Sequence, residues 1–275
     1  MTPLHRERRP LKWRGARSLA ALLLGLGCGI AMVAPALGSP ESGHESPATR
    51  PEPLVEARLQ RMSATLTAAT AFTVRTSTLH EGALASGQRV LLGGSAAIAV
   101  RKPDRLAASV GSDLGSFTLS YDGSTVTLLN PAANVYAASP LSGDLERAVG
   151  WLEDRLGIDI AVRPFLAADP HAALVAGSET TGVLVGRSVV RGIAVDHFAL
   201  RNSAVDWEIW LEAGSRALPL RVSLMGRGED SAGRITIDFE DWNLSPRLAA
   251  NAFNFVPPPG AVPATLALRP EGASP

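Results

Sequence analysis

The sequence is poor in the side chains on which covalent and metal chemistry depends. Its single cysteine, Cys28, lies in an apolar stretch near the N-terminus, so the rest of the chain has no disulfide and no thiol nucleophile. His44, His80, His171 and His197 are scattered, and no His-Glu-x-x-His or His-x-His motif occurs. These absences argue against a metal site, and no cofactor is predicted.

Motifs for nucleotides and nucleic acids are missing as well. The glycine-rich segment 82–94 lacks the Gly-Lys-Ser/Thr of a phosphate-binding loop, and it predicts turns. No Gly-x-Ser-x-Gly nucleophile motif is present. Lys102 is the only lysine beyond residue 38, and without a basic stripe no nucleic-acid partner is expected.

The N-terminus has the pattern of a cleavable signal peptide, assigned to residues 1–38. Six basic residues precede an apolar run from Leu19 to Val33, which is short for a membrane span. Cleavage after Gly38 is preferred over cleavage after Ala36. Removal of six of the 26 basic and one of the 26 acidic residues leaves a net charge of −5. The sequence therefore predicts export to the periplasm.

Alternatives to this signal peptide remain open. An uncleaved anchor is one of them, and Arg8-Arg9 also fits a twin-arginine export signal, although an ordinary basic leader is favoured. Lipidation of Cys28 is disfavoured, because the preceding leucine, Leu26, stands one position too close to it and apolar residues follow.

One domain, residues 54–262, is expected between two flexible ends. Residues 39–53 are rich in proline, serine and glutamate and predict a disordered leader, and residues 263–275 predict a disordered tail. Apolar spacing of three and four predicts helices over 54–69 and 142–156. Two shorter helical pieces are expected over 163–166 and 169–175.

Most of the remaining domain alternates apolar and polar residues, which is typical of strands exposed on one face. Asp122-Gly123 and Asn202-Ser203 are turn signals between such segments. The fold class is therefore α+β: one curved antiparallel sheet with helices on its concave face. The predicted strands cover 72–79, 89–92, 97–101, 106–110, 116–121, 125–129, 134–138, 181–190, 195–202, 206–212, 219–224 and 234–239.

The last four strands share an apolar face, which is the candidate binding surface. Alanine-rich helices would underfill a wide concave sheet and leave a hollow for acyl chains, or they would fill it completely; the residues do not decide between these outcomes. The candidate lining residues are Phe198, Leu200, Trp207, Ile209, Leu211, Leu220, Val222, Ile237 and Phe239.

One histidine is a candidate for catalysis. Asp196 and His197 are neighbours on a strand and point to opposite faces, so they cannot form an acid–base pair with each other. His197 could pair with Asp206 across the hairpin. We favour a structural histidine that stabilises strand pairing, and the protein is predicted not to be an enzyme.

Several motifs in order resemble a family of predicted periplasmic proteins of unknown function, within the lipoprotein-carrier superfamily related to LolA and LolB. The match covers nearly all of residues 54–262. The motifs are Arg101-Lys102-Pro103-Asp104-Arg105-Leu106, Tyr121-Asp122-Gly123 with Asn130-Pro131, Asp196-His197-Phe198-Ala199 with Asp206-Trp207-Glu208, and Asp241-Trp242 followed by Phe253-Asn254-Phe255-Val256-Pro257-Pro258.

The resemblance implies an unclosed β-barrel of about eleven strands, with helices as a lid over an apolar cavity. It further implies a periplasmic, non-enzymatic carrier or binder of a lipid or lipoprotein acyl chain, with peripheral membrane contact allowed. The alternative is an envelope stress or regulatory module that binds a protein partner through the same half-barrel. The resemblance identifies no catalytic residue.

Overall fold

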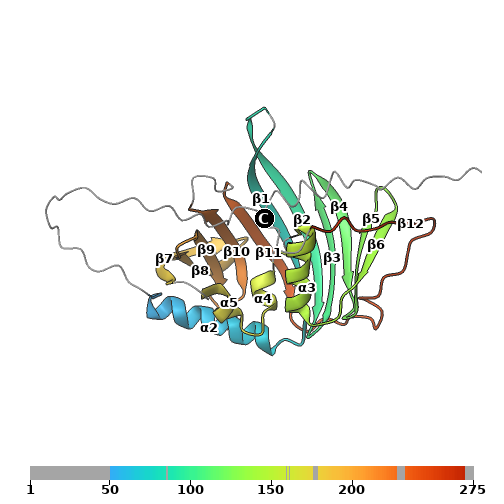
Figure 1. Ribbon diagram of the computed structural model, residues 1–275. Helices are drawn as coiled ribbons and strands as arrows, with labels where there is room; N and C mark the ends of the chain where they lie inside the picture. Colours follow the sequence, from blue (N-terminus) through green and yellow to red (C-terminus); the bar gives the residue numbers. More distant parts are fainter. Residues whose placement is uncertain are drawn as a thin grey trace, which may run out of the picture.

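Twelve strands form one continuous curved sheet in the computed structural model, which describes residues 50–84, 86–158, 160, 162–175, 179–227 and 233–269. Their spatial order is β12-β6-β5-β4-β3-β2-β1-β11-β10-β9-β8-β7 (Figure 1). The bounds are β1 Ala71–Ala83, β2 Arg89–Arg101, β3 Arg105–Ser112, β4 Gly115–Tyr121, β5 Thr125–Asn130, β6 Val135–Pro140, β7 Thr181–Val190, β8 Ile193–Arg201, β9 Val205–Glu212, β10 Pro219–Gly226, β11 Ile235–Asn243 and β12 Val262–Pro263.

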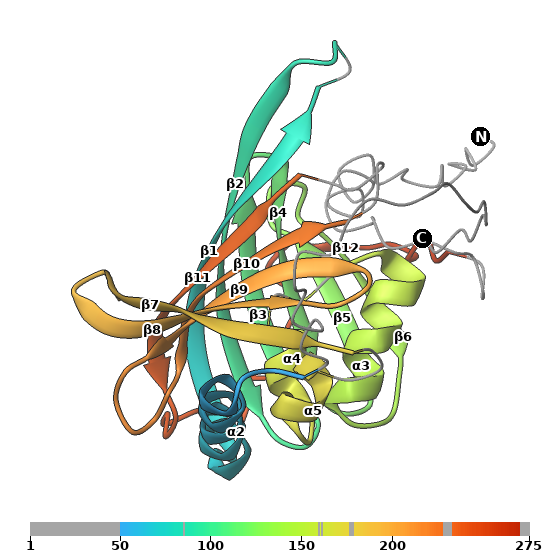
Figure 2. The same ribbon diagram turned by 90° about the vertical axis from the view of Figure 1, so that its left-hand side faces the viewer.

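The helical segments lie inside the curve of this sheet (Figure 2). All neighbouring strands are antiparallel except β12 and β6, and the two end strands, β12 and β7, do not pair with each other. The predicted unclosed half-barrel is thus confirmed, with eleven longer strands and the two-residue β12. The helical bounds are α2 Pro53–Ala68, α3 Leu145–Trp151, the π-helix η1 Leu152–Leu156, α4 Arg163–Leu166 and α5 Pro170–Val175.

Helix α2 follows directly from its sequence pattern. Val55, Leu59, Met62 and Leu66 recur at intervals of four and three, and all four are fully buried. Pro53 occupies the first turn, where its missing N–H costs no helical hydrogen bond. The apolar stripe therefore packs α2 against α5 and β7.

Polar contacts hold the position of α2 across the sheet. The guanidinium of Arg58 lies 3.3 Å from a carboxylate oxygen of Asp196 and also donates to the backbone oxygens of Glu212 and Gly214. Asp196 also accepts from Arg187 at 3.0 Å. A charge buried on the concave face is thus paired, as burial of a carboxylate requires.

The predicted turn at Asp122-Gly123 is confirmed. The side chain of Asp122 accepts from the backbone N–H groups of Ser124 and Thr125 at 3.0 and 2.8 Å, and Gly123 has a φ of 86°. Gly157 ends the second helical segment with a φ of 62°, the left-handed conformation that favours glycine after a helix.

The long hairpin of β1 and β2 corrects one expectation. Gly93-Gly94 was expected to form a turn, but β2 runs through it and pairs with β1 without interruption from Arg101 to Arg89. The neighbouring strand supplies hydrogen bonds at both glycines, so their conformational freedom is not used. The hairpin consequently extends past the other strands in both views (Figures 1 and 2).

The chain beyond β11 returns along the sheet. Phe253 is buried beneath the guanidinium of Arg101, which lies 5.1 Å from the ring centroid. The N–H of Ala264 donates to the oxygen of Tyr136 at 2.7 Å, and that of Arg269 donates to the oxygen of Arg155 at 2.8 Å. The segment predicted as a disordered tail therefore has backbone partners as far as residue 269: the edge strand β6 accepts from Ala264, and η1 accepts from Arg269.

Several predicted features lie outside the described residues: the signal peptide 1–38 with Cys28, the leader as far as residue 49, and residues 270–275. Within the described ranges, none of the helices combines the length and hydropathy needed to cross a bilayer. The same ranges contain no group of three or more His, Cys, Asp or Glu side chains arranged to hold a metal ion.

Replacement of a buried residue of α2 tests its contribution to stability. Leu59→Ala should lower the free energy of unfolding by about 2–5 kcal/mol, because it leaves a cavity beneath the helix. Leu54→Ala is the matched control, since Leu54 is 48% exposed on the same helix and its loss should change stability by less than about 0.5 kcal/mol. Urea denaturation measures both free energies of unfolding. Equal effects of the two substitutions would show that burial of Leu59 does not stabilise the fold.

Candidate functional site

The concave side of the sheet contains a partly open cavity of about 380 Å³. Its sheet wall comes from β1 to β4 and β9 to β11, and its opposite wall comes from η1, the segment after it, α4 and α5. The lining residues are Thr76, Thr78, Leu92, Gly93, Gly94, Ser95, Ala96, Ile98, Ala108, Val110, Gly111, Ser112, Leu114, Phe117, Glu153, Ile158, Ile160, Arg163, Pro164, Phe165, Ala173, Leu174, Asn202, Val205, Trp207, Val222, Leu224, Ile235 and Ile237.

Small residues on the sheet explain why space remains here. Gly94 and Ala96 of β2 lie on one face because residues two apart on a strand share a face, and Ala108 of β3 lines the cavity beside them. Glycine has no side chain and alanine has only a methyl group, so these positions leave space below the helical wall opposite. The cavity therefore exists because small residues occupy adjacent positions on neighbouring strands.

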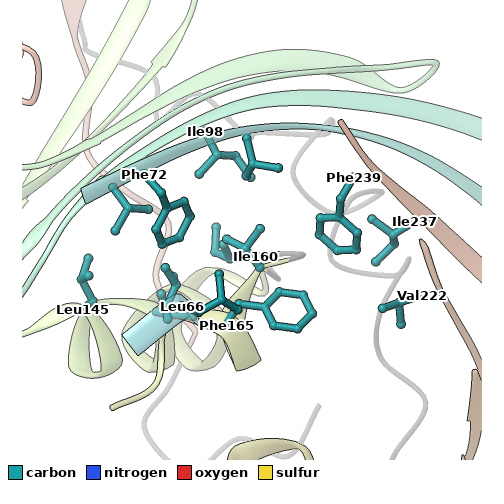
Figure 3. Close-up of a cluster of buried hydrophobic side chains, with 14 of the residues drawn as sticks. Leu66, Phe72, Ile98, Leu145, Ile160, Phe165, Val222, Ile237 and Phe239 are labelled. Carbon is teal, nitrogen blue, oxygen red and sulfur yellow. The ribbon is translucent and has the colours of Figure 1, made fainter. Parts of the chain in front are cut away.

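Large side chains fill the adjoining part of the concave face. Phe165 of α4 packs edge-to-face on Phe239, with ring centroids 5.4 Å apart, and Phe72 lies 5.5 Å from Trp242. Figure 3 shows Phe165 and Ile160 between the strands on one side and the helices on the other. Tight aromatic packing therefore bounds the cavity at this end.

Three of the nine residues predicted to line a hollow do line this cavity: Trp207, Val222 and Ile237. Five others, Phe198, Leu200, Ile209, Leu211 and Phe239, are buried in the same hydrophobic core but are absent from the cavity lining. These five residues fill the core beside the cavity, where Phe239 packs on Phe165 of α4.

Leu220 lies elsewhere, in a separate cluster with Val190 and Val195, next to Trp210. The alternation of β10 predicts the concave face for Leu220, and a β-bulge reverses that assignment. Between Pro219 and Arg221 the register shifts so that an extra residue is accommodated on β10. Such a bulge changes the face of the residues before it, and neither composition nor periodicity marks its position.

Most of the cavity wall was missed from the sequence. The predicted lining residues are large apolar residues of the last four strands, whereas the wall also includes Ala96, Val110 and Phe117 of the first half of the sheet and Ile158 and Leu174 from the helical side. Runs of small inward-facing residues on adjacent strands were the available signal, and it requires the strand register.

His197 does not pair with Asp206. Its Nε2 lies 3.0 Å from a carboxylate oxygen of Glu208, and its ring stacks on Trp210 with centroids 4.0 Å apart. Asp206 is instead held by Arg201, which donates two hydrogen bonds to it and lowers the pKa of that carboxyl. Residue 197 of β8 points to the face opposite the buried residues 196, 198 and 200, and His197 is absent from the cavity lining.

Among the described residues, two charged side chains occur in the cavity wall, Glu153 of η1 and Arg163 of α4, and they form an ion pair with each other. Glu153 is 19% exposed and Arg163 is 56% exposed. Burial raises the pKa of Glu153 above its ordinary value, and the hydrogen bond and charge of Arg163 only partly oppose this shift.

This shift predicts a pH effect on stability. Because the folded state binds a proton at Glu153 more tightly than the unfolded state, the stability from this group is greatest at low pH and is lost as pH rises through the raised pKa. The difference in melting temperature, wild type minus Glu153→Gln, should therefore decrease as the pH is raised from about 4 to about 7. Thermal unfolding across this range measures it, and a difference that rises with pH would show that the Arg163 pair outweighs burial.

The fold and cavity define the class: an unclosed half-barrel whose helices enclose an apolar cavity. The chain belongs to the family described as predicted periplasmic protein (DUF2092), whose match covers residues 55–267. The family predicted from the motifs is thereby confirmed. The comparison with curated proteins found no match to this sequence.

Solved structures with a similar fold share little sequence with this chain. The lipoprotein LppX of Mycobacterium tuberculosis is 15% identical with a TM-score of 0.42, over 71% of this chain and 98% of its own. A putative outer membrane lipoprotein-sorting domain from Vibrio parahaemolyticus is 11% identical with a TM-score of 0.33, over 72% and 95%. The MucA/MucB complex of Pseudomonas aeruginosa matches at 15% identity and a TM-score of 0.39, over 73% and 60%.

Proposed function

We propose that the protein is a periplasmic, non-enzymatic binder or carrier of a hydrophobic ligand, either a lipid or the acyl chain of a lipoprotein. The observation that carries this proposal is the apolar cavity of about 380 Å³ between sheet and helices. That volume falls in the range of roughly 300–1,000 Å³ of small-molecule sites. Each methylene buried there would contribute about 0.8 kcal/mol of transfer free energy.

The walls suit a chain better than a polar metabolite. Ile98, Phe117, Ile160, Phe165 and Trp207 offer apolar surface from both sheet and helices. A polar ligand would lose hydrogen bonds to water against these side chains without replacement. The family's description as predicted periplasmic agrees with a location between two membranes, where lipids need a protein to cross water.

Two neighbouring alanines on β2 give a matched test. Ala96 faces the cavity and Ala97 faces away from it. Ala96→Trp should fill the hollow and weaken binding of the neutral fluorophore N-phenyl-1-naphthylamine by about tenfold or more, because the displaced chain loses its apolar contacts. Ala97→Trp should leave binding within about twofold of the wild type.

Fluorescence titration measures both variants, with thermal unfolding as the check that each is folded. Equal binding by the two variants would locate the probe outside the cavity and remove support for the proposal.

Native mass spectrometry of the purified protein tests the ligand directly. We expect a lipid-sized mass to accompany the protein and to be released by organic solvent. A protein that carries no lipid and takes up no N-phenyl-1-naphthylamine would refute the binding proposal.

A protein partner is the second candidate, and the edge strand β7 favours it. Val183, Val185 and Val189 of this strand are 49%, 56% and 66% exposed. The outer edge of β7 is paired near Gly182, where the N–H of Glu52 donates to its oxygen at 2.9 Å, and the structure records no partner strand for the rest of that edge among the described residues. A stoichiometric protein without lipid in the native mass spectrum would support this alternative.

A further inference from the structure

The cavity wall is apolar except for a few hydroxyl and amide groups and one ion pair, Glu153 with Arg163. These are the only charged side chains that the structure describes in the lining. A hollow that only encloses hydrocarbon needs no such pair, since partly buried charges lose hydration. The pair therefore requires an explanation beyond chain binding.

Arg163 has donors to spare. A guanidinium carries five N–H donors, and the side-chain contact recorded for Arg163 within the described ranges is the one from its Nη1 to the Oε2 of Glu153. Its side chain is also 56% exposed, so a ligand atom can reach it. Most of its hydrogen-bonding capacity is thus available beside the cavity.

The position of Arg163 places charge next to hydrocarbon. It begins the four-residue helix α4, and Pro164 and Phe165 that follow also line the cavity. Phe165 is buried with 2% exposure and reaches the aromatic cluster around Phe239. A ligand whose chain lies along Phe165 would carry its polar end close to the guanidinium.

We propose that Arg163 is a specificity-determining residue that receives the anionic head group of the bound lipid, a carboxylate or a phosphate monoester. This inference rests on the proposed function. Guanidinium groups bind both kinds of oxyanion through paired N–H donors. The head group shares Arg163 with Glu153 or displaces that carboxylate, so the two anions compete for one guanidinium.

Three ligands with the same 16-carbon chain separate head group from chain: hexadecanoic acid, hexadecyl phosphate and hexadecan-1-ol. Each is used below its aggregation concentration to displace N-phenyl-1-naphthylamine from the protein expressed from its full coding sequence. The wild type should bind at least one of the two acids about tenfold more tightly than the alcohol. A preference for hexadecanoic acid points to a free fatty acid as the ligand, and a preference for hexadecyl phosphate points to a phospholipid-type head group.

Substitution of Arg163 should abolish this preference. Arg163→Gln should weaken binding of the preferred anion about tenfold and leave the alcohol within about twofold, whereas Arg163→Lys should retain part of the preference. Glu153→Gln should strengthen anion binding because a competing carboxylate is lost. Arg61→Gln is the matched control, since Arg61 lies exposed on α2, outside the cavity lining, and removes the same charge.

The outcomes separate this inference from the proposed function. If the wild type binds the alcohol as tightly as both anions, or if Arg163→Gln affects anion binding no more than Arg61→Gln, the head-group role of Arg163 is refuted while chain binding stands. If none of the three ligands displaces the probe, both are refuted. Melting temperatures of all variants show whether a loss of binding reflects unfolding.

Discussion

The pairing of β1 with β11 holds the two halves of the molecule together. These strands are antiparallel from Thr73 opposite Asn243 to His80 opposite Ile235, and they join β2–β6 on one side to β7–β10 on the other. Without this ladder each half would expose an unpaired edge and a hydrophobic face. Its residues are far apart in the chain, so its formation costs loop entropy that only the shared core can offset.

Burial of the concave face is the second constraint, and the helices satisfy it incompletely. Helix α2 seals one end with four fully buried side chains, while the much shorter α4 and α5 face small residues such as Ala96 and Ala108. The unfilled volume lies where short helices meet small strand residues. The ion pair of Glu153 and Arg163 lies in this same wall, so apolar space and charge occur together.

Local structure was predictable because it depends on near neighbours. The alternation of Trp207, Ile209 and Leu211 and the turn at Asp122-Gly123 were predicted correctly, since side-chain direction and turn chemistry are properties of a few successive residues. The bulge that moves Leu220 was not predicted, and His197, expected to stabilise strand pairing, contacts Glu208 rather than Asp206. Both depend on the register between strands, which periodicity does not contain.

The sequence by itself determined the half-buried strands, the helices, the turns and the family, because hydrophobic period and motif order are linear properties of the chain. Tertiary structure alone decided that a cavity exists and which residues border it. Of the predicted lining residues, Phe198 packs in the core while Trp207 borders the hollow, although both are buried on the same face. Empty space depends on what stands opposite each side chain, and that is settled only when sheet and helices come together.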